Sequence, residues 1–220
     1  MEEIKLKKAT SHLVTMHDVR PWNARPICAA GRFLGHENTK YSTHHTAVAS
    51  ASYIRRLTGY DRFGKLPGSY AAKAADLQAV GRSHPMARIP HDMRSGMTIW
   101  HDADTAVAGL DPTSPVAMHV VATLPIDDTL DQWVSLVEDY AAEAFASRGM
   151  VSDWALHALA DENGGWAIRP HAHFIVTLLN WRTDRRLGKR NQLWLASDAQ
   201  LRTAERKWYE MSGVHPIRLP

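Results

Sequence analysis

The chain has 220 residues, of which 45% are hydrophobic and 22% charged, and its net charge is +3, a composition that is ordinary for a globular protein with a substantial core. A single cysteine excludes an internal disulfide and a zinc thiolate cluster, and no run approaches the roughly 18 apolar residues of a membrane span. The first residues, MEEIKLKKAT, lack the apolar segment of a secretory signal, so we expect a cytoplasmic protein without a membrane partner.

The first half of the chain contains one clear element and several weak ones. Residues 46–58 are rich in alanine and predict a helix that ends at Gly59. Hydrophobic periodicity in the other segments is short or interrupted. They predict a strand over 11–19, an ambiguous segment over 25–35, a loop over 61–70, a short helix over 70–82, and a long loop from 83 to 98, around the sequence MTIWHDAD.

The second half has stronger periodicity. Residues 114–125 predict a strand that Pro125 closes. The following segment begins at Asp128 or Thr129 as an N-cap, carries apolar residues on one face and predicts a helix that ends at Gly149. Two further strands, 150–159 and 169–180, flank the Asn- and Gly-rich turn ADENGGW, and Ser197 with Gln200 forms a capping-box pattern before a last helix.

Two histidines lie one residue apart in the second strand of this predicted hairpin. Because alternate side chains of a strand share a face, His171 and His173 point the same way. With the turn near 163–165, His157 on the first strand lies opposite residue 171. Three imidazoles can then converge on one face, and neutral imidazole is a good ligand for a divalent metal ion. Ordinary hydrogen-bonded histidines are the alternative interpretation of the same pattern.

Basic residues gather in two segments, one of which contains interleaved aromatic residues. The segment 53–65 holds four Arg or Lys residues, and the segment 180–192 holds five. This pattern suits a phosphate backbone with bases to stack on, although two solvated loops would give it as well. The aromatic residues that could stack on bases are Tyr60, Phe63 and Trp181.

The histidine pattern, together with a tyrosine on a separate helix, resembles the HUH endonucleases. More closely, the chain resembles the plasmid-mobilisation relaxases of the MobA/MobL type. The matching segments are MHVVATLP, the amphipathic helix that follows it, SRGMVSDWALHALADENGGWAIRPHAHFIVTLLNWR, and upstream TAVASASYIRR. The resemblance covers roughly residues 40–210.

The resemblance implies an α+β fold, with a central antiparallel sheet of about five strands and helices packed mainly on one face. It implies one relaxase domain over 1–220, in which 1–39 is a less certain extension. It also implies a divalent metal ion, Mg or Mn, and a reaction that nicks and rejoins origin-of-transfer DNA, in single-stranded or hairpin form, through a 5′-phosphotyrosyl intermediate. Accessory relaxosome and coupling proteins are further expected partners.

Carried over residue by residue, the resemblance makes Tyr53 the nucleophile and the three histidines the metal ligands. Tyr60 and Tyr41 are alternative nucleophiles. Asp104 stands where the family has a glutamate, Arg169 stands where it has an asparagine, and His44 and His45 precede the helix that carries Tyr53. Asp104, His44 and His45 are expected to support the site. The residues expected to bind DNA are Arg55, Arg56, Arg62, Lys65, Arg182, Arg185, Arg186, Lys189 and Arg190.

Two other functions remain open from the sequence. A rolling-circle replication initiator of the HUH type would share the histidines but usually carries its tyrosine after them, where Tyr209 is found. A non-catalytic metal- or DNA-binding protein would use the histidines for structure only. The remaining histidines considered, His84, His91, His101, His119 and His215, are expected to be surface or structural residues.

Overall fold

The structure of the chain is a computed structural model. It describes residues 20–29, 46–85, 90–91, 94–106, 109–180, 189–190 and 197–216, with the backbone alone at 189–190. In this part of the chain no helix combines the length and the apolar character that crossing a bilayer requires. The strand predicted over 11–19 lies outside the described residues.

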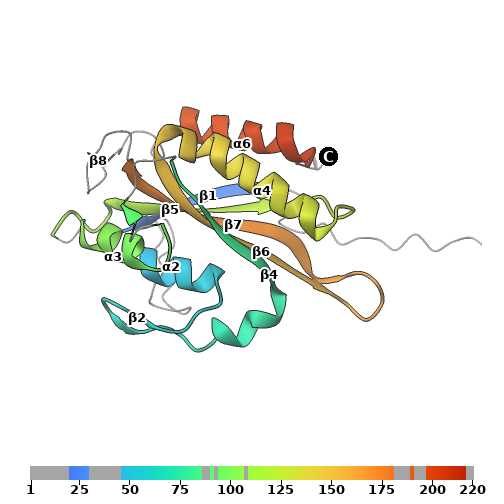
Figure 1. The fold of residues 1–220 in the computed structure, drawn as a ribbon, viewed down its shortest axis with the longest axis horizontal. Helices are drawn as coiled ribbons and strands as arrows, with labels where there is room; N and C mark the ends of the chain where they lie inside the picture. Colours follow the sequence, from blue (N-terminus) through green and yellow to red (C-terminus); the bar gives the residue numbers. More distant parts are fainter. Residues whose placement is uncertain are drawn as a thin grey trace, which may run out of the picture.

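A twisted antiparallel sheet forms the centre of the fold (Figure 1). Its main strands follow the order β1-β5-β7-β6-β4, and β8 pairs with the end of β7. The expected sheet of about five antiparallel strands is confirmed. The strands are β1 (Trp22–Cys28), β4 (Leu77–Ser83), β5 (Pro115–Thr123), β6 (Met150–Ala160), β7 (Trp166–Asn180) and β8 (Lys189–Arg190).

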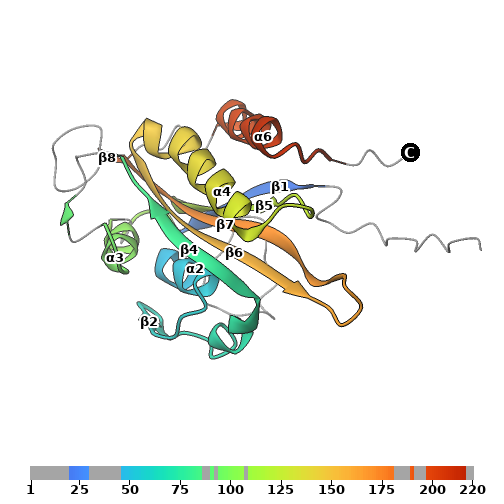
Figure 2. The same cartoon turned by 45° about the vertical axis from the view of Figure 1, so that its right-hand side comes forward.

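Helices cover both faces of this sheet (Figures 1 and 2). The two long helices, α4 (Leu130–Ala144) and α6 (Asp198–Ser212), pack together on one face. Most of the helical residues therefore lie on one face, as expected. The two short helices, α2 (Ala47–Ile54) and α3 (Thr98–Thr105), pack on the other. Two hydrophobic cores result, one on each face. Along β6, β7 and the part of β5 from Ala117 onward, buried apolar residues with even numbers belong to the core against α4 and α6, and those with odd numbers belong to the core against α2 and α3.

Helix α2 begins where the sequence predicts and ends earlier. The Thr46 side chain accepts a hydrogen bond from the Ala49 amide and caps the first turn. The helix ends at Ile54 rather than at Gly59, because Arg56 adopts a left-handed conformation with φ of 56°. A short hairpin follows within the segment expected to be a loop, formed by β2 (Tyr60–Asp61) and β3 (Gly64–Lys65).

Two predictions in the middle of the chain are wrong. The segment 70–82 is a 3₁₀ helix, η1 (Ala71–Asp76), followed by strand β4, which forms because its backbone pairs with β6 along the sheet edge. The long loop predicted around MTIWHDAD contains α3, whose buried Ile99, Trp100 and Ala103 lie at helical spacing between polar residues. In both segments a tertiary partner decides the structure more strongly than the local sequence does.

The elements of the second half of the chain are confirmed. Thr129 caps α4 and forms a reciprocal capping box with Gln132. A 3₁₀ turn, η3 (Ala146–Arg148), then leads to Gly149, which takes the left-handed conformation that terminates the helical segment. Ser197 caps α6 by accepting from the Gln200 amide.

Candidate active site

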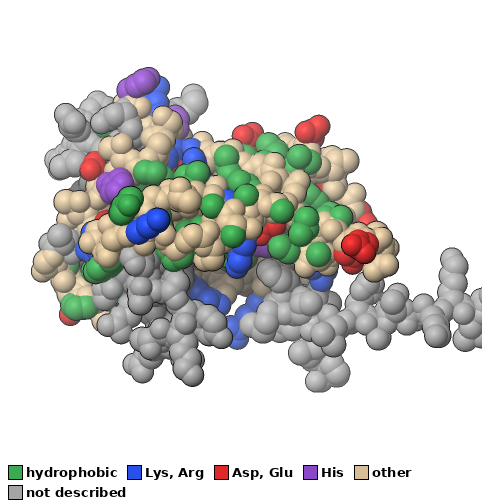
Figure 3. Space-filling view, turned by 90° about the horizontal axis from the view of Figure 1, so that it is seen from below, with side chains coloured by type: hydrophobic (Ala, Val, Ile, Leu, Met, Phe, Trp, Pro, Cys, Tyr) green, Lys and Arg blue, Asp and Glu red, His purple; other side chains and the backbone are tan. Residues whose placement is uncertain are grey.

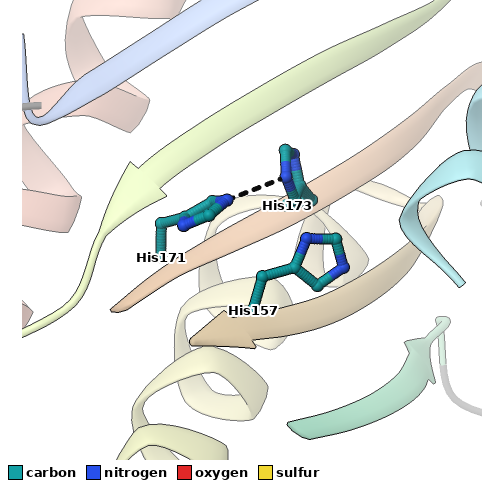
Figure 4. A group of neighbouring side chains, drawn as sticks. All are labelled: His157, His171 and His173. Atoms are coloured by element: carbon teal, nitrogen blue, oxygen red, sulfur yellow. Dashed lines mark hydrogen bonds between the residues drawn. The ribbon is translucent and has the colours of Figure 1, made fainter. Parts of the chain in front are cut away.

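The three histidines predicted from the hairpin come together in the structure. His157 on β6 is the direct partner of His171 on β7, so the hairpin places the third ring where the strand register requires. Potential ligand atoms of the three side chains all lie within 4.8 Å of one another. Figure 4 shows His171 and His173 on one strand and His157 on its neighbour, with all three rings grouped together.

Hydrogen bonds to backbone carbonyls fix the tautomer of two of the three rings. Nδ1 of His171 lies 2.7 Å from the carbonyl oxygen of Arg169, which can only accept, so the proton belongs on Nδ1 and Nε2 carries the lone pair. In the same way Nε2 of His157 donates to the carbonyl of Ile54 at 2.8 Å, and the lone pair on its Nδ1 accepts from Nη2 of Arg56 at 2.9 Å, a bond that a metal ion at this nitrogen would replace. This donor set suits a metal ion, because a ligating imidazole needs a lone pair and a partner for its other nitrogen.

Burial keeps two of the rings neutral. His157 and His173 are 0% and 5% exposed. Burial is the largest influence on both, and it lowers the pKa of His157 to about 4 and the pKa of His173 well below its ordinary value; nearby Arg56 acts in the same direction. Both rings therefore retain their lone pairs at neutral pH. Nε2 of His171 and Nε2 of His173 lie 3.1 Å apart, roughly the separation of two adjacent ligands with metal–nitrogen distances of about 2.0–2.1 Å.

Tyr53 lies beside this cluster. It is the seventh residue of α2 and is partly exposed. Its ring centroid is 5.8 Å from that of His173 and 6.5 Å from that of His119, in edge-on arrangements. The ring of Tyr70 also packs against that of Tyr53, with the centroids 5.3 Å apart. The structure thus brings the expected phenol and the expected histidines to one face of the sheet.

Arg56 connects α2 to the histidines. Its buried guanidinium donates to both carboxylate oxygens of Asp76, at 2.8 and 2.6 Å, and its Nη2 is 2.9 Å from Nδ1 of His157. It also lies 4.7 Å from the centre of the Tyr53 ring. Sequence reasoning placed Arg56 among the DNA-binding residues, but its side chain is only 3% exposed and is turned inward. Asp76 was not predicted from the sequence.

Asp104 holds the opposite end of α2. Its two carboxylate oxygens accept from the amides of Ala47 and Val48, at 2.9 and 3.1 Å. These amides belong to the first helical turn and have no partner within the helix. Burial raises the pKa of Asp104 although the two amide bonds oppose that shift. The side chain therefore supports the helix that carries Tyr53 and makes no contact with the histidines.

A second buried carboxylate, which the sequence analysis missed, anchors the same face. Asp153 is 0% exposed. It accepts from Nε and Nη2 of Arg82 and from Nε1 of Trp100, and Nε of Arg55 lies 3.1 Å from it. Arg55, expected to bind DNA, therefore has its guanidinium directed toward Asp153, with 18% of its side chain exposed. An aspartate among the mainly apolar residues of this strand was the signal available in the sequence.

Two of the three rival tyrosines lie away from the histidines. Tyr60 is in β2, after α2 has ended, and is 68% exposed. Tyr209 is in α6, on the face of the sheet opposite the histidines, and its hydroxyl donates to Glu205 at 2.6 Å. Tyr41, His44 and His45 are outside the described residues.

The remaining basic residues divide between the β2–β3 hairpin and the segment after β7. Arg62 and Lys65 are exposed on the hairpin, where Arg62 packs over the Phe63 ring at 4.8 Å. On the α2 side of the molecule, Lys and Arg side chains are interspersed with hydrophobic ones (Figure 3). Lys189 and Arg190 are described only as backbone of β8, and Arg182, Arg185, Arg186 and Trp181 lie outside the described residues.

Comparisons with known proteins agree with this architecture. Residues 45–213 match the MobA/MobL family. A solved structure described as "Molecular Basis of Vancomycin Resistance Transfer in Staphylococcus aureus" is similar, with a TM-score of 0.63 and 15% identity, over 87% of this chain and 89% of that one. At this identity the likeness concerns the fold, and it confirms the expected α+β architecture. No curated protein matches the chain significantly.

Proposed function

Because the chain belongs to the MobA/MobL family of plasmid-mobilisation relaxases, we propose that it nicks and rejoins one strand of origin-of-transfer DNA through a covalent link to Tyr53. The observation that carries the proposal is that three imidazole rings and one phenol lie close together on a single face of the sheet. A single relaxase domain over the whole chain is part of the proposal.

The chemical step is a transesterification. The Tyr53 oxygen attacks a DNA phosphorus and forms a phosphotyrosyl bond, while the bond from phosphorus to the 3′ oxygen breaks. The phenol loses its proton to solvent and the departing 3′ oxygen gains one, so no co-reactant is consumed. Because one phosphodiester replaces another, the 3′ hydroxyl can later reverse the reaction and reseal the strand.

His157, His171 and His173 would hold a divalent metal ion, which supplies positive charge to non-bridging phosphate oxygens as negative charge grows there. Three imidazoles favour a transition-metal ion over Mg²⁺, which prefers oxygen ligands. Of Mg²⁺ and Mn²⁺, we therefore propose Mn²⁺ as the bound ion. Zn²⁺ and Ni²⁺ should be compared with it in the same assays.

The other residues of the site position these groups. Arg56 links the nucleophile helix to Asp76 and to the ring of His157, and Asp104 fixes the first turn of the same helix. The exposed hairpin residues Arg62 and Lys65 would bind phosphates of single-stranded DNA, with Tyr60 and Phe63 offering faces for its bases. Accessory relaxosome and coupling proteins, and a cytoplasmic location, remain part of the proposal.

The test is covalent capture of DNA. Purified protein with Mn²⁺ is incubated with a labelled pool of single-stranded oligonucleotides from the mobilisation region of its plasmid, and the products are separated under denaturing conditions. We expect a protein–DNA adduct whose linked peptide, identified by mass spectrometry, contains Tyr53. Supercoiled plasmid that carries the origin should become relaxed.

Matched variants separate the competing interpretations. Tyr53→Phe should abolish the adduct, whereas Tyr60→Phe and Tyr209→Phe should form it. An adduct on Tyr209 would instead favour a replication initiator. His171→Ala should fold and lose the metal ion. The absence of any adduct, with wild-type protein that is folded and loaded with metal, would favour the non-catalytic alternative and refute the proposal.

A further inference from the structure

We propose that His119, a fourth histidine, is a positioning residue that holds His173 in the tautomer needed for metal binding. The inference rests on the metal-dependent function proposed above. It assigns a role to a side chain that sequence reasoning places among the surface and structural histidines.

His119 reaches His173 from the neighbouring strand. In the register of β5 and β7, His119 pairs with Ile175, and His173 pairs with Val121. The two histidines are therefore diagonal neighbours on the face that α2 covers. Nε2 of His119 lies 2.8 Å from Nδ1 of His173, and the ring centroids are 5.0 Å apart. This contact is on the side of the His173 ring away from the nitrogen that faces His171.

The position of one proton decides whether His173 can bind a metal ion. A neutral imidazole carries a single N–H, so an available lone pair on Nε2 requires the proton on Nδ1. That N–H is buried and needs an acceptor. The side-chain acceptor that the structure places there is Nε2 of His119. With the opposite tautomer, His173 would direct an N–H at Nε2 of His171, 3.1 Å away, and would offer no lone pair.

The other two rings do not depend on a side chain in this way. His157 donates to the carbonyl of Ile54, and His171 donates to the carbonyl of Arg169. A backbone carbonyl can only accept, so it fixes the tautomer of its partner permanently. At the nitrogen that points out of the cluster, only the His173 ring is paired with a group that can itself change tautomer. Substitution of His119 should therefore alter one ligand of the three and leave the others in place.

The experiment measures metal affinity without DNA. Mn²⁺ and Zn²⁺ binding to the metal-stripped full chain is followed by calorimetry for wild type, His119→Phe and His119→Gln. Phenylalanine keeps a ring but removes the acceptor, and we expect affinity to fall about 10- to 100-fold, the effect typical of losing an outer partner of a metal-binding histidine. Glutamine offers a carbonyl oxygen and should restore most of the affinity. His101→Phe, at an exposed position of α3, is the control and should bind like wild type.

A second readout reports the proton directly. Imidazole ¹H–¹⁵N spectra of the Zn²⁺-loaded wild type should show His119 as the Nδ1–H tautomer, a result that a purely structural role does not require. If His119→Phe fails to fold in EDTA, His119→Leu takes its place. Unchanged affinity in a folded variant, or His119→Gln behaving like His119→Phe, would overturn the inference.

The same measurements distinguish this inference from the proposed function. Wild-type protein that binds no metal ion would refute both. Wild-type protein that binds metal and forms the DNA adduct, beside a His119→Phe variant of equal affinity, would refute only the role of His119. A weakened His119→Phe variant, beside wild type that forms no adduct, would support the role of His119 and refute the nicking reaction.

Discussion

Replacement of Asp76 by asparagine tests whether the buried pair with Arg56 holds the site together. The two side chains are 4% and 3% exposed and share two hydrogen bonds. Burial is the largest single influence and by itself would raise the pKa of Asp76, but the hydrogen bonds and charge of Arg56, together with His157 and His171, outweigh it and keep that pKa below its ordinary value. Asp76→Asn has nearly the same shape and removes the charge, so the guanidinium keeps only neutral acceptors, among them Nδ1 of His157 and the carbonyl oxygen of Tyr53.

The expected loss follows from leaving a buried charge without its counter-ion. Such a change costs about 3–5 kcal/mol, a large part of a total stability of roughly 5–15 kcal/mol. With a urea m-value of about 2–3 kcal/mol/M, the unfolding midpoint should fall by roughly 1–2.5 M. Asp139→Asn, at an exposed position of α4, should change stability by less than about 0.5 kcal/mol.

The assay is urea unfolding followed by circular dichroism and tryptophan fluorescence. The double variant Arg56→Met with Asp76→Leu should recover much of the loss, because it removes both buried charges. Two results would show that the reasoning is wrong: Asp76→Asn losing no more stability than Asp139→Asn, or the double variant being less stable than Asp76→Asn alone by several kcal/mol.

Three further predictions concern pH, packing and DNA. Because the pKa of His157 is about 4 in the folded protein and about 6.5 when unfolded, the unfolded state binds more protons between these values. The contribution of His157 to the stability of the metal-stripped protein should therefore be fully present above about pH 6.5 and be lost as pH falls toward 4, by on the order of 3 kcal/mol. If the urea midpoint of His157→Gln falls as steeply with pH as that of wild type, the decline belongs to other groups. Gly81→Ala should destabilise the fold by roughly 1–3 kcal/mol, since a Cβ there would lie 2.1 Å from the Trp154 ring; an unaltered melting temperature would contradict this packing. Tyr60→Ala and Phe63→Ala should each weaken single-stranded DNA binding by about 1–3 kcal/mol without changing metal affinity, and equal binding in fluorescence anisotropy would exclude the hairpin as a stacking surface.

The sequence by itself determines the parts of the site that local rules govern. A strand repeats every two residues, so His171 and His173 had to share a face. The turn predicted near 163–165 put His157 opposite His171, and the structure confirms this pair, although two register shifts lie between the turn and His157. Capping patterns at Thr129 and Ser197 likewise marked the starts of the two long helices correctly.

Segments whose conformation depends on distant partners were predicted poorly. The alanine-rich residues 70–82 favour helix locally, yet their second half pairs with β6, about 75 residues away along the chain. Helix α3 lacks a strong periodic signal and gains its place by burying Ile99 and Trp100 against α2 and the sheet. In these segments the free energy of tertiary packing exceeds the small local preferences.

Only the tertiary structure decides which side chains surround the histidines. Arg56 and His157 are separated by 101 residues in sequence, and His119 and His173 by 54, so no local pattern could pair them. The same holds for the side of the sheet on which each tyrosine lies, because that depends on which helix packs on which face. Periodicity along a strand is a property of a few consecutive residues, whereas the partners that set charge, tautomer and access to the site come from segments that meet only when the sheet is assembled.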